Sequence, residues 1–522
     1  MGSFPVGFAT HYTKGESLME RRQTHVVLSA AFVLVVVLIY SFVSLPQAKA
    51  IPAFSRKYQT SCTTCHSNYP ELNDFGLAFK QNGFKFPKDD ETFVKDPPVL
   101  LGAKAQKEAF PDAVYPGELP GNLPIAFRYS GNFTWNAKQP QPIQAMGFVP
   151  QTDLFVPNTF TIISAGSFGP NLAFWIDNDI STGGTGAGGG LGDGYIRYND
   201  IGRFFHLPRN AFNVRFGQFE LDLPFTQARS IYPSAYDVFS ETAVALGPRC
   251  SATAPVVTVC QTASNPFMLG TPQRGIEFGG FPGNGNFTWS VAVIDGTNSA
   301  YGTGPALFAR NTKDVYVRVS QKFNLERDPE SRNGVQAAGP TGPHDHTSIR
   351  IGGFYYHGDN QLNFGGIPYG LLGSTNGTFN EPFYRAGGDV RFKFRNRVEL
   401  FALGMVGHDN NHMVDTDAQT ITSAPAVTYT GGFAGSNFWV FPWLITYMRY
   451  DFVNSPTDFA NGVSEYRTRN RYSPGIQMLI RANLKVIGEY QYHWAQPYMS
   501  NITETTLFFR PHSFVAGIDY VY

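Results

Sequence analysis

Residues 125–135 read Ile125-Ala-Phe-Arg-Tyr-Ser-Gly-Asn-Phe-Thr-Trp135, in which apolar or aromatic residues alternate with polar or small ones. Successive side chains of a β-strand point to opposite faces, so a period of two predicts a strand with one apolar and one polar face. The same alternation returns at residues 315–320, 389–395 and 484–492, with charged side chains on the second face. A soluble antiparallel sheet would also show this pattern, so alternation by itself leaves two fold classes open.

The number and length of these segments favour a membrane barrel. Roughly sixteen occur, and several approach ten residues, the length that crosses hydrocarbon at the tilt of a barrel. Tyrosines gather near segment ends, at Tyr355-Tyr356 and at Tyr447 and Tyr450, as in the aromatic girdles of such barrels. The last segment closes on an aromatic terminus, Tyr522, which resembles the assembly signal of outer-membrane proteins. We therefore predict a mainly β chain, with an antiparallel outer-membrane β-barrel of roughly sixteen strands over residues 125–522.

Composition agrees with a barrel and excludes other classes of protein. Aromatic residues make up 15% of the 522 residues and charged residues only 15%, which is aromatic-rich and charge-poor for a soluble protein. The chain has 54 glycines and 36 prolines, but its 46 Phe and 26 Tyr do not suit a disordered chain. The formal net charge is zero, so no nucleic-acid partner is expected.

The first fifty residues have the features of an export signal. Arg21 and Arg22 precede an apolar run from Val26 to Leu45, and Ala48-Lys49-Ala50 supplies a small-x-small cleavage pattern. We predict a signal peptide over residues 1–50, cleaved after Ala50. Because the apolar run is about 20 residues long, an uncleaved membrane anchor is the alternative.

Cys62-Thr63-Thr64-Cys65-His66 is a C-x-x-C-H motif. Two thiols at this spacing add to the two vinyl groups of one haem, and the adjoining histidine becomes an axial ligand of the iron. A zinc site would need two further Cys or His ligands nearby, and residues 67–145 contain neither. We predict one covalently attached haem c held by Cys62 and Cys65, with His66 as the metal ligand.

Residues 51–90 are expected to form a small, partly helical haem domain. Pro70 suits the first turn of a helix and Asn82-Gly83 suits its end. Gly76 would let the backbone approach a flat ligand closely, and forty residues are too few to bury a core unless the haem supplies it. Residues 91–124 are rich in proline and charge and are expected to be a linker or plug segment. In the haem domain, the helix expected between Pro70 and Asn82 would present one apolar face, made by Leu72, Phe75 and Phe79.

Residues 51–87 resemble one family specifically. The stretches Ile51-Pro-Ala-Phe-Ser-Arg-Lys-Tyr58, Pro70-Glu-Leu-Asn-Asp-Phe-Gly76 and Asn82-Gly-Phe84, together with the haem motif, are similar to the fused monohaem cytochrome–porins of the bacterial outer membrane. Its best-known members are outer-membrane cytochromes of iron-oxidising bacteria. The resemblance implies that electrons pass from an extracellular donor, Fe(II), through the haem to a periplasmic cytochrome. The protein would be an electron carrier or an Fe(II)-oxidising protein in contact with outer-membrane lipid.

Several alternatives stay open at this point. The chain could be a solute porin in which the haem domain is a structural plug, a carrier of electrons outward to an extracellular acceptor, or a peroxide-reducing haem protein with an open sixth position. Cys250 and Cys260 could form a loop disulfide or stay free thiols. The sixth iron ligand is not assigned among the candidates, which are Met146, His206, Lys80, Lys85, Tyr69, Asn68 and the amine of Ile51.

Overall fold

The computed structural model divides the chain into two compact units, residues 1–50 and 51–522. The predicted signal peptide and Ala50 lie outside the described residues. The structure describes residues 53–86, 90–95, 99–100, 104–112, 118–119, 121, 124–137, 151–169, 171–182, 190–226, 230–240, 260–262, 267–282, 285–296, 313–325, 347–363, 378–395, 397–415, 420–454, 458–460, 463–465, 469–493, 496–499, 506–509 and 512–522.

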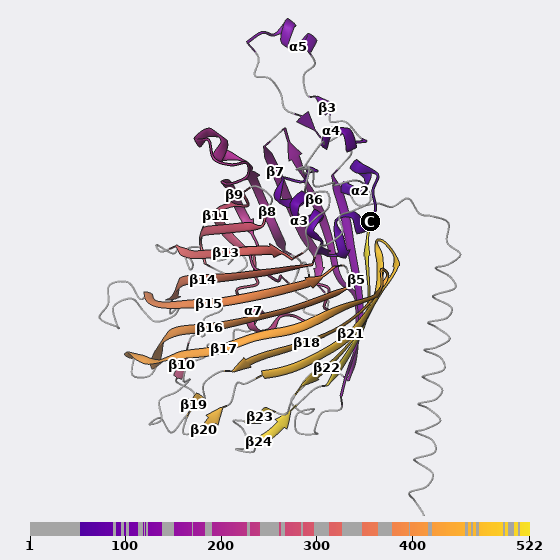
Figure 1. Cartoon of the computed structure of the whole chain (residues 1–522). Helices are drawn as coiled ribbons and strands as arrows, with labels where there is room; N and C mark the ends of the chain where they lie inside the picture. Colours follow the sequence, from indigo (N-terminus) through magenta and orange to yellow (C-terminus); the bar gives the residue numbers. More distant parts are fainter. Residues whose placement is uncertain are drawn as a thin grey trace, which may run out of the picture. The chain divides into compact units, whose positions relative to one another are not determined.

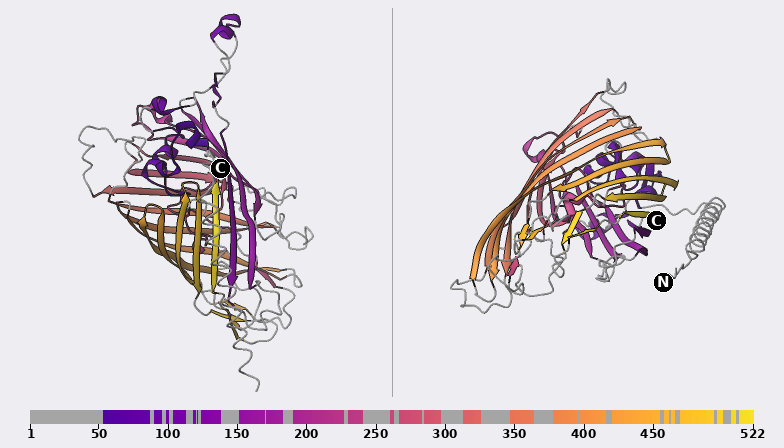
Figure 2. Two further views of the ribbon diagram at one scale, coloured as in Figure 1. Left: turned by 90° about the vertical axis from the view of Figure 1, so that its right-hand side faces the viewer. Right: turned by 90° about the horizontal axis from the view of Figure 1, so that it is seen from below.

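Sixteen of the described strands form one closed antiparallel barrel (Figures 1 and 2). The ring closes because β25 pairs with β5 and β11 pairs with β9, so no strand of the ring has a free edge. This confirms the predicted mainly β fold and its strand number. The strands of the ring are β5 (Ile125–Asn136), β6 (Thr152–Phe168), β7 (Leu172–Thr182), β8 (Leu191–Tyr198), β9 (Asn213–Phe219), β11 (Gln273–Gly280), β12 (Phe287–Ile294), β13 (Asp314–Asn324), β14 (Ser348–Asn363), β15 (Thr378–Phe394), β16 (Val398–Asp415), β17 (Thr420–Phe441), β18 (Leu444–Asn454), β21 (Arg469–Arg481), β22 (Leu484–His493) and β25 (Ser513–Val521).

Shorter strands lie beside this ring. The strand β10 (Cys260–Thr262) pairs with the end of β16. Three further pairs join β3 (Val99–Leu100) to β4 (Glu118–Leu119), β19 (Asp458–Ala460) to β20 (Val463–Glu465), and β23 (Gln496–Met499) to β24 (Thr506–Phe509). In the part of the chain that the structure describes, no helix is long and apolar enough to cross a membrane.

The alternation read from the sequence places apolar side chains outside the barrel and polar ones inside. On β13, Val315 and Val319 are exposed, whereas Arg318 between them is 3% exposed and forms an ion pair with Asp389 of β15 at 2.7 Å. The same arrangement recurs elsewhere, because Met448 of β18 is 53% exposed while its neighbours on the strand are buried. An apolar outer face with a charged interior is the reverse of a soluble protein and is expected of a barrel in lipid.

The two ends of the barrel differ in the length of their connections. At the end that carries the C-terminus, two or three residues join β6 to β7, β15 to β16, β17 to β18 and β21 to β22, whereas the β8–β9 and β13–β14 connections at this end are longer. The connections at the opposite end are longer in most cases, as between β9 and β11 or between β18 and β21. We call the first of these the short-turn end.

The N-terminal segment, residues 53–95, packs against the barrel wall at the short-turn end, and Figure 2 shows its indigo helices within the curve of the strands. Its core joins the wall directly, since Phe84 stacks near Trp175 of β7 with ring centroids 5.6 Å apart. The segment contains α2 (Ala53–Tyr58), η1 (Cys62–Thr64), β1 (His66–Asn68), β2 (Glu71–Leu72), α3 (Asp74–Gln81) and α4 (Asp90–Phe93), and α5 (Lys104–Ala109) lies in the expected linker.

The prediction for the helix of this segment is correct for its end and wrong for its start. It ends at Gln81, with Asn82 as C-cap and Gly83 at a φ of +73°, as predicted. It begins at Asp74 with Asn73 as N-cap, so Pro70 and Leu72 lie before it. The reason is that residues 66–72 fold back as the β1–β2 pair, which holds the histidine of the motif.

A second segment inside the barrel was not predicted from the sequence. Residues 220–226 and 230–240, here the inner segment, follow β9 and contain α7 (Asp237–Ser240). The Tyr232 hydroxyl donates to Asn437 of β17 at 2.5 Å, and Arg449 of β18 donates to the carbonyl oxygen of Ala235 at 2.6 Å. Residues of the inner segment join inward-facing aromatics of the wall in one buried cluster, so the lumen holds a packed core as well as charged groups.

Candidate haem-attachment site

A single turn of 3₁₀ helix presents the two thiols of the motif. In η1 the Cys65 amide donates to the Cys62 carbonyl oxygen at 3.1 Å, and Ser61 caps the turn. Residues three apart eclipse each other on a 3₁₀ helix, so this turn brings the two side chains to one side. Both cysteines are free and half-buried. Burial raises the pKa of Cys62 and raises that of Cys65 to about 12, so both groups are protonated thiols at neutral pH.

His66 is held in the tautomer that a metal ligand requires. Its Nδ1 lies 3.2 Å from the carbonyl oxygen of Pro70, which only accepts, so Nδ1 carries the proton and Nε2 keeps its lone pair. Burial lowers the pKa of the ring to about 4, and the imidazole is therefore neutral. Pro70 thus serves the site through its carbonyl group rather than by starting a helix.

Asn73, which the sequence analysis did not single out, joins the motif to α3. Its Oδ1 accepts from the Gly76 amide at 2.8 Å, and its Nδ2 donates to the Thr64 carbonyl oxygen at 3.1 Å. The Asn73 amide also donates to the Cys65 carbonyl oxygen at 3.0 Å. An asparagine before Asp-Phe-Gly is a recognisable N-cap pattern, and this signal could have located it.

Gly76 is needed for close packing of α3 on the motif. A Cβ at this position would come within 1.9 Å of the Cys65 carbonyl oxygen. The glycine therefore lets α3 lie directly against the backbone of the motif. The predicted contact of Gly76 with a flat ligand stays a prediction.

A cavity of about 620 Å³ adjoins the motif and is lined by residues 58–61, 63–64, 86, 92–93 and 95. Its volume lies within the range of about 300–1,000 Å³ that is usual for cofactor sites. Tyr58, Phe86 and Phe93 contribute aromatic walls, and the rings of Tyr58 and Phe86 stack at 4.1 Å. The other lining residues are polar, and Cys62, Cys65 and His66 are not among them. Two thiols and one neutral imidazole are nevertheless the residue types that fit a covalently bound haem.

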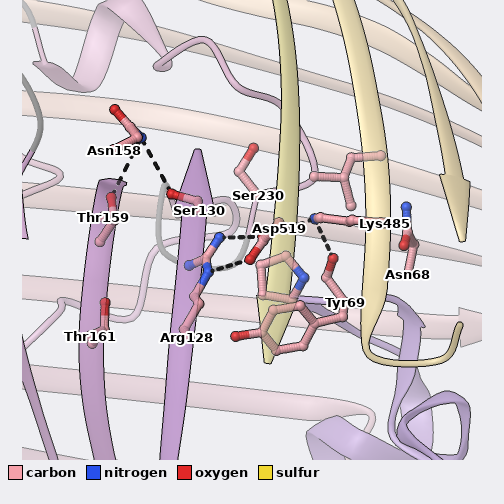
Figure 3. Close-up of polar contacts among 12 residues, drawn as sticks. Asn68, Tyr69, Arg128, Ser130, Asn158, Thr159, Thr161, Ser230, Lys485 and Asp519 are labelled. Atoms are coloured by element: carbon pink, nitrogen blue, oxygen red, sulfur yellow. Dashed lines mark hydrogen bonds and ion pairs between the residues drawn. The ribbon is translucent and has the colours of Figure 1, made fainter. Parts of the chain in front are cut away.

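Polar contacts fix the N-terminal segment in the barrel wall (Figure 3). Lys485 of β22 donates to the carbonyl oxygen of Tyr69 at 2.5 Å. The Tyr69 ring lies beneath the guanidinium of Arg128 of β5, 5.5 Å from its centroid, and Arg128 pairs with Asp519 of β25 at 2.9 Å. Asn68, two residues after the histidine of the motif, donates to Gln477 of β21 at 2.5 Å.

Ion pairs reach the segment from the opposite side of the ring. Asp74 at the start of α3 pairs with Lys322 of β13 at 2.5 Å, and Glu71 lies 3.9 Å from Arg391 of β15. Burial alone would raise the pKa of Asp74, but Lys393 and Lys322 lower it to about 2. Two further hydrogen bonds run from the segment to backbone carbonyl oxygens of the barrel. Arg56 donates to that of Ile125, and Lys85 donates to that of Gly169.

The structure shows where some of the candidate sixth ligands of the iron lie. Asn68 and Lys85 both donate to the wall, and His206 is exposed at the end of η2 (Ile201–Phe205). Ile51 and Met146 lie outside the described residues, as does Cys250, and the side chain of Cys260 is not described, so the predicted disulfide stays a prediction. Among the residues that are described, no group of three or more His, Cys, Asp or Glu is placed to hold a metal ion.

Fold and site together define a class: a closed sixteen-stranded barrel, apolar outside and charged inside, with a C-x-x-C-H motif at its short-turn end. This architecture supports an outer-membrane location. Solved structures with a similar barrel include the anion-selective porin from Comamonas acidovorans, with 10% identity, a TM-score of 0.44, and coverage of 76% of this chain and 98% of the porin. The outer-membrane channel DcaP of Acinetobacter baumannii gives 9% identity and a TM-score of 0.43 over 76% of this chain and 96% of that one. OmpT of Vibrio cholerae gives 10% identity and a TM-score of 0.38 over 81% and 100%.

At these identities and scores the likeness concerns the barrel, and nothing about activity is taken from it. No family model matches the chain. No curated protein matches it either.

Proposed function

We propose that this protein is an outer-membrane electron-transfer cytochrome whose haem is held by Cys62, Cys65 and His66. The observation that supports this most directly is the state of His66, whose Nδ1 donates to the Pro70 carbonyl oxygen, so that the neutral ring carries its lone pair on Nε2. The two thiols stand on the turn immediately before it. When bound, the haem supplies a one-electron iron couple.

The residues of the chain would perform three tasks around that group. The thiols would attach it covalently, and the imidazole of His66 would bind its iron. Asn73 would keep the motif and α3 in one arrangement, through both of its side-chain hydrogen bonds. Tyr58 and Phe86 would exclude water from one side, because their stacked rings line the adjoining cavity.

The position of the motif suggests which partner meets it directly. Short turns of outer-membrane barrels face the periplasm, so the short-turn end would face that compartment. Ser61 and Thr63, which flank Cys62, are exposed. A periplasmic cytochrome could therefore approach the edge of the site, and the extracellular donor, Fe(II) by family resemblance, would have to reach it from the other side.

A solute porin with a haem plug is the second candidate function. A specific observation favours it: a polar cavity of about 220 Å³ lies inside the barrel beside the N-terminal segment. Swelling of liposomes that contain the protein, with sugars of increasing size, measures this activity. Swelling at porin-like rates together with no reduction of the haem by any donor would favour the porin over the electron carrier.

The proposal is tested by absorption spectroscopy and stopped-flow kinetics on the full-length protein purified from its host. We expect haem bands that survive denaturation, reduction by ferrous iron, and reoxidation by a soluble c-type cytochrome. His66→Ala should abolish the axial imidazole and the electron transfer while the barrel still inserts, and His408→Ala on β16 is the matched control.

The outcomes separate the parts of the proposal. A protein without haem absorption would refute it entirely. Haem that is not reduced by ferrous iron within minutes would refute the iron donor and leave the cytochrome assignment in place. Normal axial ligation in His66→Ala would show that another residue binds the iron.

A further inference from the structure

The cavity of about 220 Å³ inside the barrel is surrounded by arginines. It lies between the N-terminal segment, the inner segment and the wall, and Leu72 and Leu77 of the N-terminal segment form part of its lining. The wall contributes one arginine from each of β8, β9, β13, β14 and β15, which are Arg197, Arg215, Arg318, Arg350 and Arg391.

Three of these arginines are paired with carboxylates of other barrel strands. Arg318 pairs with Asp389 at 2.7 Å, and the bond is bidentate because its two terminal nitrogens reach both carboxylate oxygens. The other two pairs are Arg215 with Glu277 at 2.6 Å and Arg391 with Glu399 at 2.8 Å. These pairs belong to the wall itself and stabilise it.

Arg197 and Arg350 are different. Arg197 lies over the ring of Phe281 at 5.4 Å, and Arg350 donates to the hydroxyl of Ser320 at 3.2 Å. Neither makes a salt bridge with a carboxylate of the described residues, although both line the cavity. Both side chains are half-buried, and a guanidinium without a carboxylate partner keeps donors that can bind an anion.

A carboxylate of the inner segment lies near Arg197 and Arg350. Asp222 of the inner segment lines the same cavity and interacts electrostatically with both Arg197 and Arg350. Its backbone is fixed, because the Tyr316 hydroxyl of β13 donates to the Asp222 carbonyl oxygen at 2.9 Å. Asp74 also interacts electrostatically with Arg350, and Glu277 with Arg197, so Asp222 is one of several carboxylates near the two guanidiniums.

Buried polar atoms without partners provide a second, independent observation. Ser290 is 2% exposed and Thr226 is 6% exposed, yet neither hydroxyl has a hydrogen-bond partner, and both residues line this cavity. The Nε of Arg215 is likewise without an acceptor, and the Oε2 of Glu71, which also lines the cavity, is without a donor. Since buried polar groups are nearly always satisfied in folded proteins, these atoms point to a polar occupant of the cavity.

We infer that the lumen cavity is a binding site for a small oxyanion, of the carboxylate, sulfate or phosphate class, held by Arg197 and Arg350 with help from Ser290. Planar guanidinium forks match such oxyanions geometrically. One consequence rests on the proposed electron transfer. If that proposal holds, an electron donor that reaches the N-terminal segment through the lumen is anionic, for example iron(II) chelated by a polycarboxylate.

The inference is tested by calorimetric titration of the detergent-solubilised holoprotein with citrate and, separately, with sulfate. Arg197→Gln and Arg350→Gln should each weaken binding by about tenfold or more, because each removes a charge-assisted pair of hydrogen bonds. Asp222→Asn should tighten binding several-fold, because it removes the competing carboxylate. Arg203→Gln, an exposed arginine of η2 at the short-turn end, is the control and should leave the affinity unchanged. Folding of each variant is verified by the heat-dependent mobility of the barrel on gels.

Each result of the titrations either supports or overturns the inference. Binding of either anion that depends on the two arginines supports the site, and the preferred anion identifies its source. No binding to the parent protein, or equal binding in Arg350→Gln, overturns the inference. Loss of anion binding in Asp222→Asn also overturns it, because it would assign the attraction to the carboxylate. Failure of the electron-transfer proposal would instead show as an unreduced haem in the parent protein, whatever the titrations give.

Discussion

Replacing Asn73 by alanine tests whether this residue joins the motif to α3. The change removes the N-cap acceptor for the Gly76 amide and the donor to the Thr64 carbonyl oxygen. Loss of an N-cap costs about 1 kcal/mol, and leaving a buried acceptor unpaired costs about 1–3 kcal/mol. Asn73 is only 6% exposed, so water compensates little, and the total is about 2–4 kcal/mol. The opening equilibrium of α3 should therefore rise roughly 30-fold to 700-fold.

Hydrogen–deuterium exchange with mass spectrometry, on peptides that cover residues 74–81, measures this opening. Asn73→Asp is the matched variant, because it keeps the acceptor for Gly76 and loses the donor to Thr64, and its effect should be smaller. Peptides from the barrel strands should exchange as in the parent protein. If α3 amides of Asn73→Ala exchange within about threefold of the parent rates, the side chain does not hold the motif in place.

Three further predictions concern packing, lipid contact and pH. Gly76→Ala should disrupt haem attachment, seen as loss of covalent haem on denaturing gels, because the added Cβ would lie 1.9 Å from the Cys65 carbonyl oxygen; unchanged attachment would contradict the packing. Met448→Arg places a charge on the lipid-facing surface and should destabilise the barrel by up to about 2–4 kcal/mol in urea titrations in lipid vesicles, whereas Phe110→Arg, outside the barrel strands, should not. The ion pair of Asp74 should persist on acidification until pH falls through about 2, because a depressed pKa gives stability that is present above the unfolded value and lost below the folded one; proteolysis of the N-terminal segment that begins already near pH 5 would refute this.

The barrel could be predicted from the sequence because its signal is local and repeated. An inside-out strand such as β13 shows its two faces in consecutive residues, and the absence of water in lipid forces every such strand to find partners on both sides. The C-x-x-C-H motif could also be recognised from the sequence, since Cys62, Cys65 and His66 are nearly adjacent. The strand number followed from the count of alternating segments, and the structure confirms it.

The parts that were missed depend on residues far apart in the chain. The start of α3 was misplaced because Pro70 carries an N-terminal helix signal, and only the fold-back of β2 onto β1 shows that its carbonyl oxygen is engaged by His66. The inner segment gave no periodic pattern, because its side chains pack into a lumen that exists only once the barrel closes.

By itself, the sequence determined that this chain forms a barrel and that two thiols and an imidazole stand together near its start. Both are consequences of neighbouring residues, through strand alternation and through the spacing of one motif. Only the tertiary structure decided that Lys485, Lys322 and Arg391 hold the N-terminal segment against the wall, and that five arginines from five strands face one cavity. These groups are brought together by ring closure, in which β25 pairs with β5 across nearly 400 residues, and no local pattern encodes that register.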